Sequence, residues 1–152
     1  MNKYINEQIR SFLEEPDMIA ALANVSAVIS QNYDRLNWAG FYFVKNGGLV
    51  LGPFQGKVAC VHIPFGKGVC GKCFQDAKVQ RIDDVLAFPG HIACDSASRS
   101  ELCVPVIVNG NVVAEIDLDS PEKERFTADE ENEMVQAAED IAAAWVRHHW
   151  PN

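Results

Sequence analysis

Long apolar runs and positive charge are scarce in this 152-residue chain. No apolar run approaches the ~20 residues that a membrane-spanning helix needs, which argues against insertion into a bilayer. Lysine and arginine together number 13, against 21 aspartates and glutamates, and the formal net charge is −8. Because this excess repels phosphates, we expect neither nucleic acid nor an anionic membrane as a partner.

A secretory signal and a disulfide framework are also missing. The first residues contain no apolar segment of the kind that signal peptides carry. The five cysteines are an odd number and lack the spacing of a disulfide-stapled domain. In the cytoplasm such residues rest as thiols and are oxidised only transiently. We therefore expect a cytoplasmic protein.

The order of predicted elements indicates one α+β domain over residues 1–152. Helical periodicity predicts one or two helices over 11–32, broken near Pro16, and a final helix behind a capping box at Thr127. Alternation and turn signals predict strands over 38–44, 49–54, 57–64, 79–82, 101–108 and 112–119, with a short helix near 69–76. No linker or repeat interrupts this order. We expect an antiparallel sheet flanked by N- and C-terminal helices.

Two cysteines lie in surroundings that make thiols reactive. Cys70 follows a glycine-broken loop and opens a short helix, where free backbone N–H groups favour a thiolate. Cys94 lies in an irregular segment, and irregular backbone tends to lie at the surface and carry chemistry. Cys60 lies on a predicted strand, and the alternative interpretation for it is a core residue without a chemical role. This pattern indicates thiol chemistry.

Three acidic residues are predicted to share one sheet face. Glu101 lies on one strand of the hairpin that turns at 109–110, and Asp117 and Asp119 lie on the other. Strand pairing brings Glu101 near one of these aspartates, and alternation puts both aspartates on the same face. Such carboxylates repel one another unless a cation or a shared proton intervenes. They form either a site for an ammonium group or a solvated outer face.

Several motifs resemble those of the free methionine-(R)-sulfoxide reductases, which are stand-alone GAF-domain proteins. The similarity runs from about residue 38 to residue 120, with compatible helices on both sides. The trio Cys60, Cys70 and Cys94 lies within it, whereas Cys73 and Cys103 depart from the family pattern. The matching motifs are NWAGFY (37–42), GPFQG (52–56), IP (63–64), GKGVCG (66–71), PGHIACD (89–95), SE (100–101) and DLDS (117–120).

The resemblance implies an oxidoreductase that reduces free methionine-(R)-sulfoxide to methionine. In this reaction a Cys94 thiolate attacks the sulfoxide sulfur and becomes a sulfenic acid. A second thiol condenses with it to a disulfide, and thioredoxin reduces that disulfide. Cys60 is the first choice for the resolving thiol and Cys70 the alternative. No cofactor and no metal are implied, and a homodimer is expected because related domains often pair through their terminal helices.

The same resemblance assigns a substrate site. Glu101 or Asp119 supplies the proton for the departing oxygen, and Asp117 helps to bind the ammonium group. Trp38 forms the wall against the methyl end of the substrate. Backbone N–H groups near Ile92, Ala93 and Cys94 receive its carboxylate. Asp83 is a further acidic candidate, since its segment leads into the site.

Three alternatives fit parts of the sequence. Cys70-x2-Cys73 and His91-x2-Cys94 have the residue types and spacing of a zinc site, although this leaves Cys60 and the acidic face unexplained. A sensory GAF module would bind a metabolite without turnover, but it needs an effector domain for which this chain has no room. A thioredoxin-type pair of Cys70 and Cys73 lacks the surrounding βαβ pattern.

Overall fold

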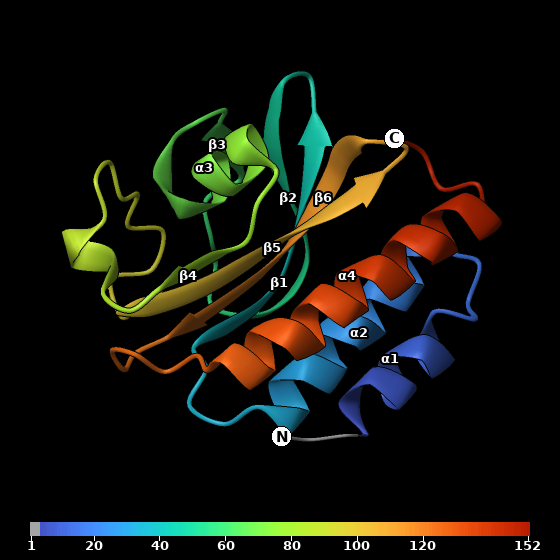
Figure 1. Cartoon of the computed structure of the whole chain (residues 1–152), viewed down its shortest axis with the longest axis horizontal. Coiled ribbons are helices and arrows are strands. Elements are labelled where there is room, and N and C mark those ends of the chain that lie inside the picture. Colours follow the sequence, from blue (N-terminus) through green and yellow to red (C-terminus); the bar gives the residue numbers. More distant parts are fainter. Residues whose placement is uncertain (1–3) are drawn as a thin grey trace.

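A computed structural model describes residues 4–152, so the first three residues of the predicted 1–152 domain lie outside it. Figure 1 shows helices on both sides of a curled sheet. In chain order the elements are α1 (Ile5–Phe12), α2 (Met18–Asn32), β1 (Trp38–Lys45), β2 (Gly48–Gly56), β3 (His62–Pro64), α3 (Gly68–Asp76), β4 (Gln80–Ile82), the 3-10 helix η1 (Val85–Ala87), β5 (Ser100–Val108), β6 (Asn111–Ser120) and α4 (Ala128–Arg147).

The sheet is antiparallel, with strand order β3-β2-β1-β6-β5-β4. Helices α2 and α4 pack on one face, and α1 packs against both of them. The short helix α3 lies on the opposite face, where it contacts β5 and β6 (Figure 1). The predicted α+β architecture, with terminal helices flanking an antiparallel sheet, is confirmed.

Alternation along the three central strands separates an apolar face from a polar one. On the face that α2 and α4 cover, every second residue in the central part of β1, β5 and β6 is apolar and almost completely buried. The intervening positions therefore point towards α3. The apolar set consists of Ala39, Phe41 and Phe43 of β1, Leu102, Val104 and Val106 of β5, and Ala114, Ile116 and Leu118 of β6.

The predicted break near Pro16 and the predicted start of the final helix are confirmed, whereas the first helix begins at Ile5 and not at residue 11 as predicted. Pro16 separates α1 from α2, and the Asp17 side chain accepts a hydrogen bond from the backbone N–H of Ala20 at 2.9 Å. At the start of α4, Thr127 and Glu130 form the expected capping box. Over residues 4–152, no helix combines the length and apolarity that crossing a membrane requires.

The strand predicted over 57–64 is wrong for its first half, because only β3 is strand there. β2 ends at Gly56, whose positive φ of 140° disfavours residues with a side chain, and the chain then leaves the sheet. Side chains hold this irregular segment in place, since the Trp38 indole N–H donates to the Lys57 carbonyl and the Tyr42 hydroxyl donates to the Cys60 carbonyl. Cys60 is therefore a half-buried loop residue.

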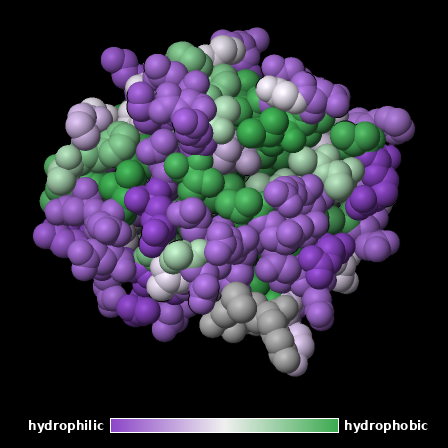
Figure 2. Space-filling view, viewed as in Figure 1, coloured by the Kyte–Doolittle hydropathy of each residue, from purple (hydrophilic) through white to green (hydrophobic). Residues whose placement is uncertain are grey.

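Hydrophilic side chains cover most of the face shown in Figure 2, with hydrophobic groups gathered between them. On the α3 side of the sheet, Glu101, Glu115 and Asp117 are all buried.

We predict that Gly71→Ala destabilises the protein by about 1–3 kcal/mol, because a Cβ atom there would lie 2.8 Å from the Pro64 carbonyl oxygen. This contact overrides the ~1 kcal/mol by which alanine normally favours a helix over glycine. Chemical denaturation measures the change. Lys72→Ala, on the more exposed side of α3, serves as the control and should cost less than about 0.5 kcal/mol. Equal stability of Gly71→Ala and wild type would contradict this close packing.

Candidate active site

A small cavity, partly open to solvent, lies between the polar face of the sheet, α3 and the segment 83–99. Seven of the ten predicted site residues line it: Trp38, Cys70, Ile92, Cys94, Glu101, Asp117 and Asp119.

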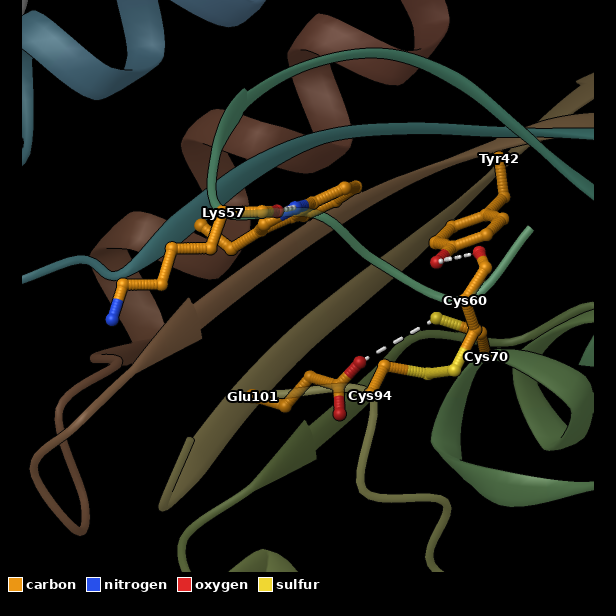
Figure 3. The surroundings of a disulfide bond; sticks show 7 residues. Tyr42, Lys57, Cys60, Cys70, Cys94 and Glu101 are labelled. Carbon is orange, nitrogen blue, oxygen red and sulfur yellow. Dashed lines mark hydrogen bonds between the residues drawn. A yellow bond between two sulfur atoms is a disulfide. The ribbon is translucent and has the colours of Figure 1, made fainter. Parts of the chain in front are cut away.

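A disulfide joins Cys60 to Cys94, with 5.3 Å between their Cα atoms (Figure 3). The bond links the irregular segment after β2 to the loop before β5, and both cysteines are half-buried. Tyr42 steadies the first segment through its 2.9 Å hydrogen bond to the Cys60 carbonyl (Figure 3). Because Cys94 lines the cavity, the disulfide lies at the cavity wall.

Cys70 remains a free thiol, buried in the first turn of α3. Its Sγ lies 3.5 Å from Glu101 Oε2 and 3.6 Å from Cys103 Sγ. The hydrogen bond from Cys103 lowers the pKa of Cys70, but burial and the nearby carboxyl groups raise it more, to a net value well above the ordinary one. The predicted thiolate at Cys70 is therefore wrong, because burial among acids outweighs the helix N-terminus.

The predicted acidic cluster is present and buried. Glu101 pairs directly across from Asp119, and Asp117 lies two positions earlier on the same face of β6. Burial raises the pKa of Glu101 well above its ordinary value, and the charges of both aspartates raise it further. Burial, followed by the charge of Asp117, raises the pKa of Asp119 in the same way. Burial and mutual repulsion therefore favour the protonated form in this cluster, and a nearby cation would relieve the same repulsion.

Aromatic rings form the wall beside these acids. Trp38 stacks on Phe54 and on Tyr42, with ring centroids 5.1 Å and 5.8 Å apart. Trp38 lines the cavity as predicted, whereas Tyr42 was missed by the sequence analysis. The alternation that sets positions 38 and 42 on the same face of β1 could have identified it.

The loop that carries Cys94 is held by Asp95. Its carboxylate accepts hydrogen bonds of 2.9 Å from the Ala97 backbone N–H and from the Asn37 amide. These bonds lower the pKa of Asp95. The N–H of Cys94 itself donates to the Ile92 carbonyl at 3.1 Å. Of the three N–H groups predicted to receive a carboxylate, this one is already engaged in the oxidised form.

Two expectations do not match the geometry. Asp83 is exposed, lies outside the cavity lining, and uses its carbonyl to accept a hydrogen bond from the Glu124 N–H. It belongs to the turn after β4, which directs its side chain to solvent instead of the site. The zinc pattern of the sequence is not assembled either, because its fourth member, Cys94, is bonded to Cys60.

Comparison with known proteins identifies relatives for both the sequence and the fold. A GAF domain family model matches residues 17–146. Protein YtsP of Bacillus subtilis is 53% identical over 133 residues, which cover 86% of this chain and 82% of that protein. The free methionine-R-sulfoxide reductase of Escherichia coli is 48% identical over 122 residues, covering 80% and 74% respectively.

A solved structure agrees closely with this fold. The free methionine-R-sulfoxide reductase of Neisseria meningitidis, in complex with its substrate, superposes with a TM-score of 0.92 at 36% identity. The match covers 95% of this chain and 88% of that one. The chain therefore belongs to the GAF domain family and is a close relative of enzymes named free methionine-R-sulfoxide reductase.

Proposed function

We propose that this protein reduces free methionine-(R)-sulfoxide to methionine, with Cys94 as the nucleophile and Cys60 as the resolving thiol. The observation that carries the proposal is the Cys60–Cys94 disulfide at the wall of a cavity lined by buried carboxyl groups. A redox-active pair beside a proton source is what sulfoxide reduction needs. A sensory module would need neither.

The reaction proceeds in two balanced steps. The Cys94 thiolate attacks the substrate sulfur and forms a sulfur–sulfur bond as the sulfoxide oxygen takes up a proton. The oxygen then passes to the Cys94 sulfur, the S–O bond of the substrate and the new sulfur–sulfur bond break, and methionine leaves, so that Cys94 becomes a sulfenic acid. The Cys60 thiol then attacks the Cys94 sulfur, a disulfide forms, and the oxygen departs as water. Two thiols are oxidised and one sulfoxide is reduced.

The buried acids supply the proton that the first step requires. Because burial raises the pKa of Glu101 and of Asp119, a carboxyl group of this pair is suited to donate a proton to the sulfoxide oxygen. Protonation weakens the S–O bond as the thiolate attacks. Cys70 sits beside Glu101 at 3.5 Å and serves as an alternative second thiol in this scheme.

The substrate is oriented by charge and shape. Asp117 is buried, and its Oδ1 has no hydrogen-bond partner among residues 4–152, so a substrate ammonium would satisfy it. The Trp38 ring faces the methyl end of the substrate. The backbone of Ile92 and Ala93 receives the substrate carboxylate.

Regeneration requires an external dithiol, and we propose thioredoxin for this role. The half-buried position of the Cys60–Cys94 pair leaves the disulfide within reach of such a reductant. We also propose a cytoplasmic location and a homodimer, in keeping with the thiol-rich sequence and with the pairing of related domains.

We expect Cys94→Ser to abolish both methionine release and the trapping of a sulfenic acid. A serine hydroxyl is a far poorer nucleophile than a thiolate at neutral pH. Single-turnover chromatography of methionine and dimedone labelling measure the two losses. Ser96→Ala, a change in the same loop, is the control. Near-normal single-turnover activity of Cys94→Ser would move the nucleophile to Cys70.

Cys60→Ser should release about one methionine per site and then stall with thioredoxin as reductant, because attack no longer leads to a disulfide. Quantifying methionine against enzyme in the first turnover tests this. Dithiothreitol should restore cycling by reducing the sulfenic acid directly. If Cys70→Ser stalls while Cys60→Ser cycles normally, the resolving thiol is Cys70.

Racemic free methionine sulfoxide and its N-acetyl derivative, each supplied with dithiothreitol, test the substrate. We expect only the R diastereomer of the free amino acid to be consumed at a useful rate.

Loss of a charge-assisted contact worth roughly 1.5–3 kcal/mol predicts about a tenfold to hundredfold lower kcat/KM for the acetylated form. Asp117→Asn should lower kcat/KM for the free amino acid while the domain stays folded. Equal kcat/KM values for the two substrates would contradict binding of the ammonium group by the carboxylates.

A further inference from the structure

Behind the cavity, four buried side chains bring sulfur and oxygen donors together. Cys70 and Cys73 lie three residues apart on the inner side of α3, Cys103 lies on β5, and Glu115 lies on β6. We call these four residues the thiol cluster. The reaction proposed above uses neither Cys73, Cys103 nor Glu115, and all three cysteines are free thiols.

Sheet register explains why the cluster assembles. Pro105 is the direct partner of Glu115 on β5, so Cys103 lies diagonally across from Glu115 on the face that points to α3. The alternation that puts Asp117 and Asp119 in the cavity extends back to Glu115. Glu115 was not among the predicted site residues, although the alternation through Asp119 and Asp117 leads to it.

The donor atoms lie at close range. Cys103 Sγ is 3.0 Å from Glu115 Oε1 and 3.6 Å from Cys70 Sγ. The donor atoms of Cys70, Cys103 and Glu115 all lie within 4.8 Å of one another. The Cys73 thiol lies close enough to Cys103 and Glu115 for both to affect its pKa. The cluster thus offers three converging ligands and a fourth donor beside them.

One donor in the cluster lacks a partner. Glu115 is completely buried, and its Oε2 makes no hydrogen bond to any residue of the described chain 4–152. An unsatisfied buried carboxyl oxygen is costly. A bound cation would satisfy this oxygen and replace the protons that burial otherwise retains on the cluster.

We propose that the thiol cluster binds one thiophilic divalent cation of the zinc class through Cys70, Cys103 and Glu115, with Cys73 as the fourth ligand. Zinc–sulfur bonds of ~2.3 Å and zinc–oxygen bonds of ~2.0 Å at tetrahedral angles set sulfur atoms about 3.8 Å apart, and sulfur and oxygen about 3.5 Å apart. The observed sulfur–sulfur distance of 3.6 Å already fits this geometry. The sulfur–oxygen distance of 3.0 Å fits after a small rotation of Glu115.

The ion has a route to the site and a consequence there. Cys70 lines the substrate cavity, so an ion can pass from solvent to the thiol cluster through that opening. Binding releases the protons of the ligating thiols to solvent. It also converts the Cys70 thiol into a metal ligand. A bound cation and a redox role of Cys70 therefore exclude each other.

The test uses the double variant Cys60→Ser, Cys94→Ser, which removes the active-site thiols and leaves the three of the thiol cluster. The full chain is titrated anaerobically with Co²⁺, whose tetrahedral thiolate complexes have intense visible absorption and a thiolate-to-metal charge-transfer band in the ultraviolet. We expect one Co²⁺ per chain, displaced by one equivalent of Zn²⁺. No tetrahedral thiolate spectrum, or a spectrum without one-to-one stoichiometry, would overturn the proposal.

Variants within this background assign the ligands. Removal of an outer-shell partner alone weakens metal affinity ~10–100-fold, so Cys103→Val should weaken it by at least about 100-fold. Glu115→Gln provides an independent test if the valine variant does not fold, as judged by circular dichroism. His91→Ala, which removes the histidine of the alternative zinc pattern, is the matched control and should leave affinity unchanged.

Unchanged affinity in both Cys103→Val and Glu115→Gln would overturn the proposal. So would formation of a Cys70–Cys103 disulfide in air together with absence of a bound ion in the reduced protein, which would make these thiols a redox pair. None of these measurements depends on methionine sulfoxide turnover, so failure here is distinct from failure of the proposed reductase activity.

Discussion

Four carboxyl groups share one face of the β5–β6 hairpin: Glu101, Glu115, Asp117 and Asp119. Removing these groups from water and bringing them close together costs free energy. Burial of apolar side chains on the other face of the same strands offsets this cost. There, alternate residues are packed under α2 and α4 in the main hydrophobic core. The position of the acids is thus fixed by the burial of their apolar neighbours, because a register shift of one residue would exchange the two faces.

The response to this crowding divides the acidic face into two regions. Towards the opening, Asp117 and Asp119 border the cavity together with Glu101, where a substrate ammonium and a shared proton can relieve the repulsion. Towards the interior, Glu115 is enclosed by thiols, which donate hydrogen bonds but carry no positive charge. Cys70 touches both regions, since it lies near Glu101 on one side and Cys103 on the other.

The disulfide connects this polar face to solvent. Cys60 and Cys94 belong to the two irregular segments that border the cavity, and each is held by a polar contact: Tyr42 on the Cys60 carbonyl, and Asn37 on the Asp95 carboxylate. The disulfide thus lies on irregular segments at the edge of the site, whereas the acids lie on paired strands.

Much of the architecture could be predicted from the sequence alone, because local residue patterns determine the helices, strands and turns. Period-2 alternation, the turn at 109–110 and the capping box at Thr127 predicted the hairpin, its pairing of Glu101 with an aspartate, and the final helix. The trio of cysteines and the acidic face were found in the same way, with the family resemblance assigning their roles.

Tertiary structure decided what depends on burial and on contacts between distant segments. Local cues suggested a thiolate at Cys70. Packing against β5 and β6, however, buries this thiol beside carboxyl groups, and its pKa is therefore raised. Asp83 was placed near the site by its position in the chain, yet its turn faces solvent. The joining of Cys60 to Cys94 across 34 residues, and the meeting of Cys73, Cys103 and Glu115, required the packing of α3 and two loops onto the sheet. Periodicity fixes the face on which a side chain lies, whereas only packing between elements fixes its neighbours and its exposure to water.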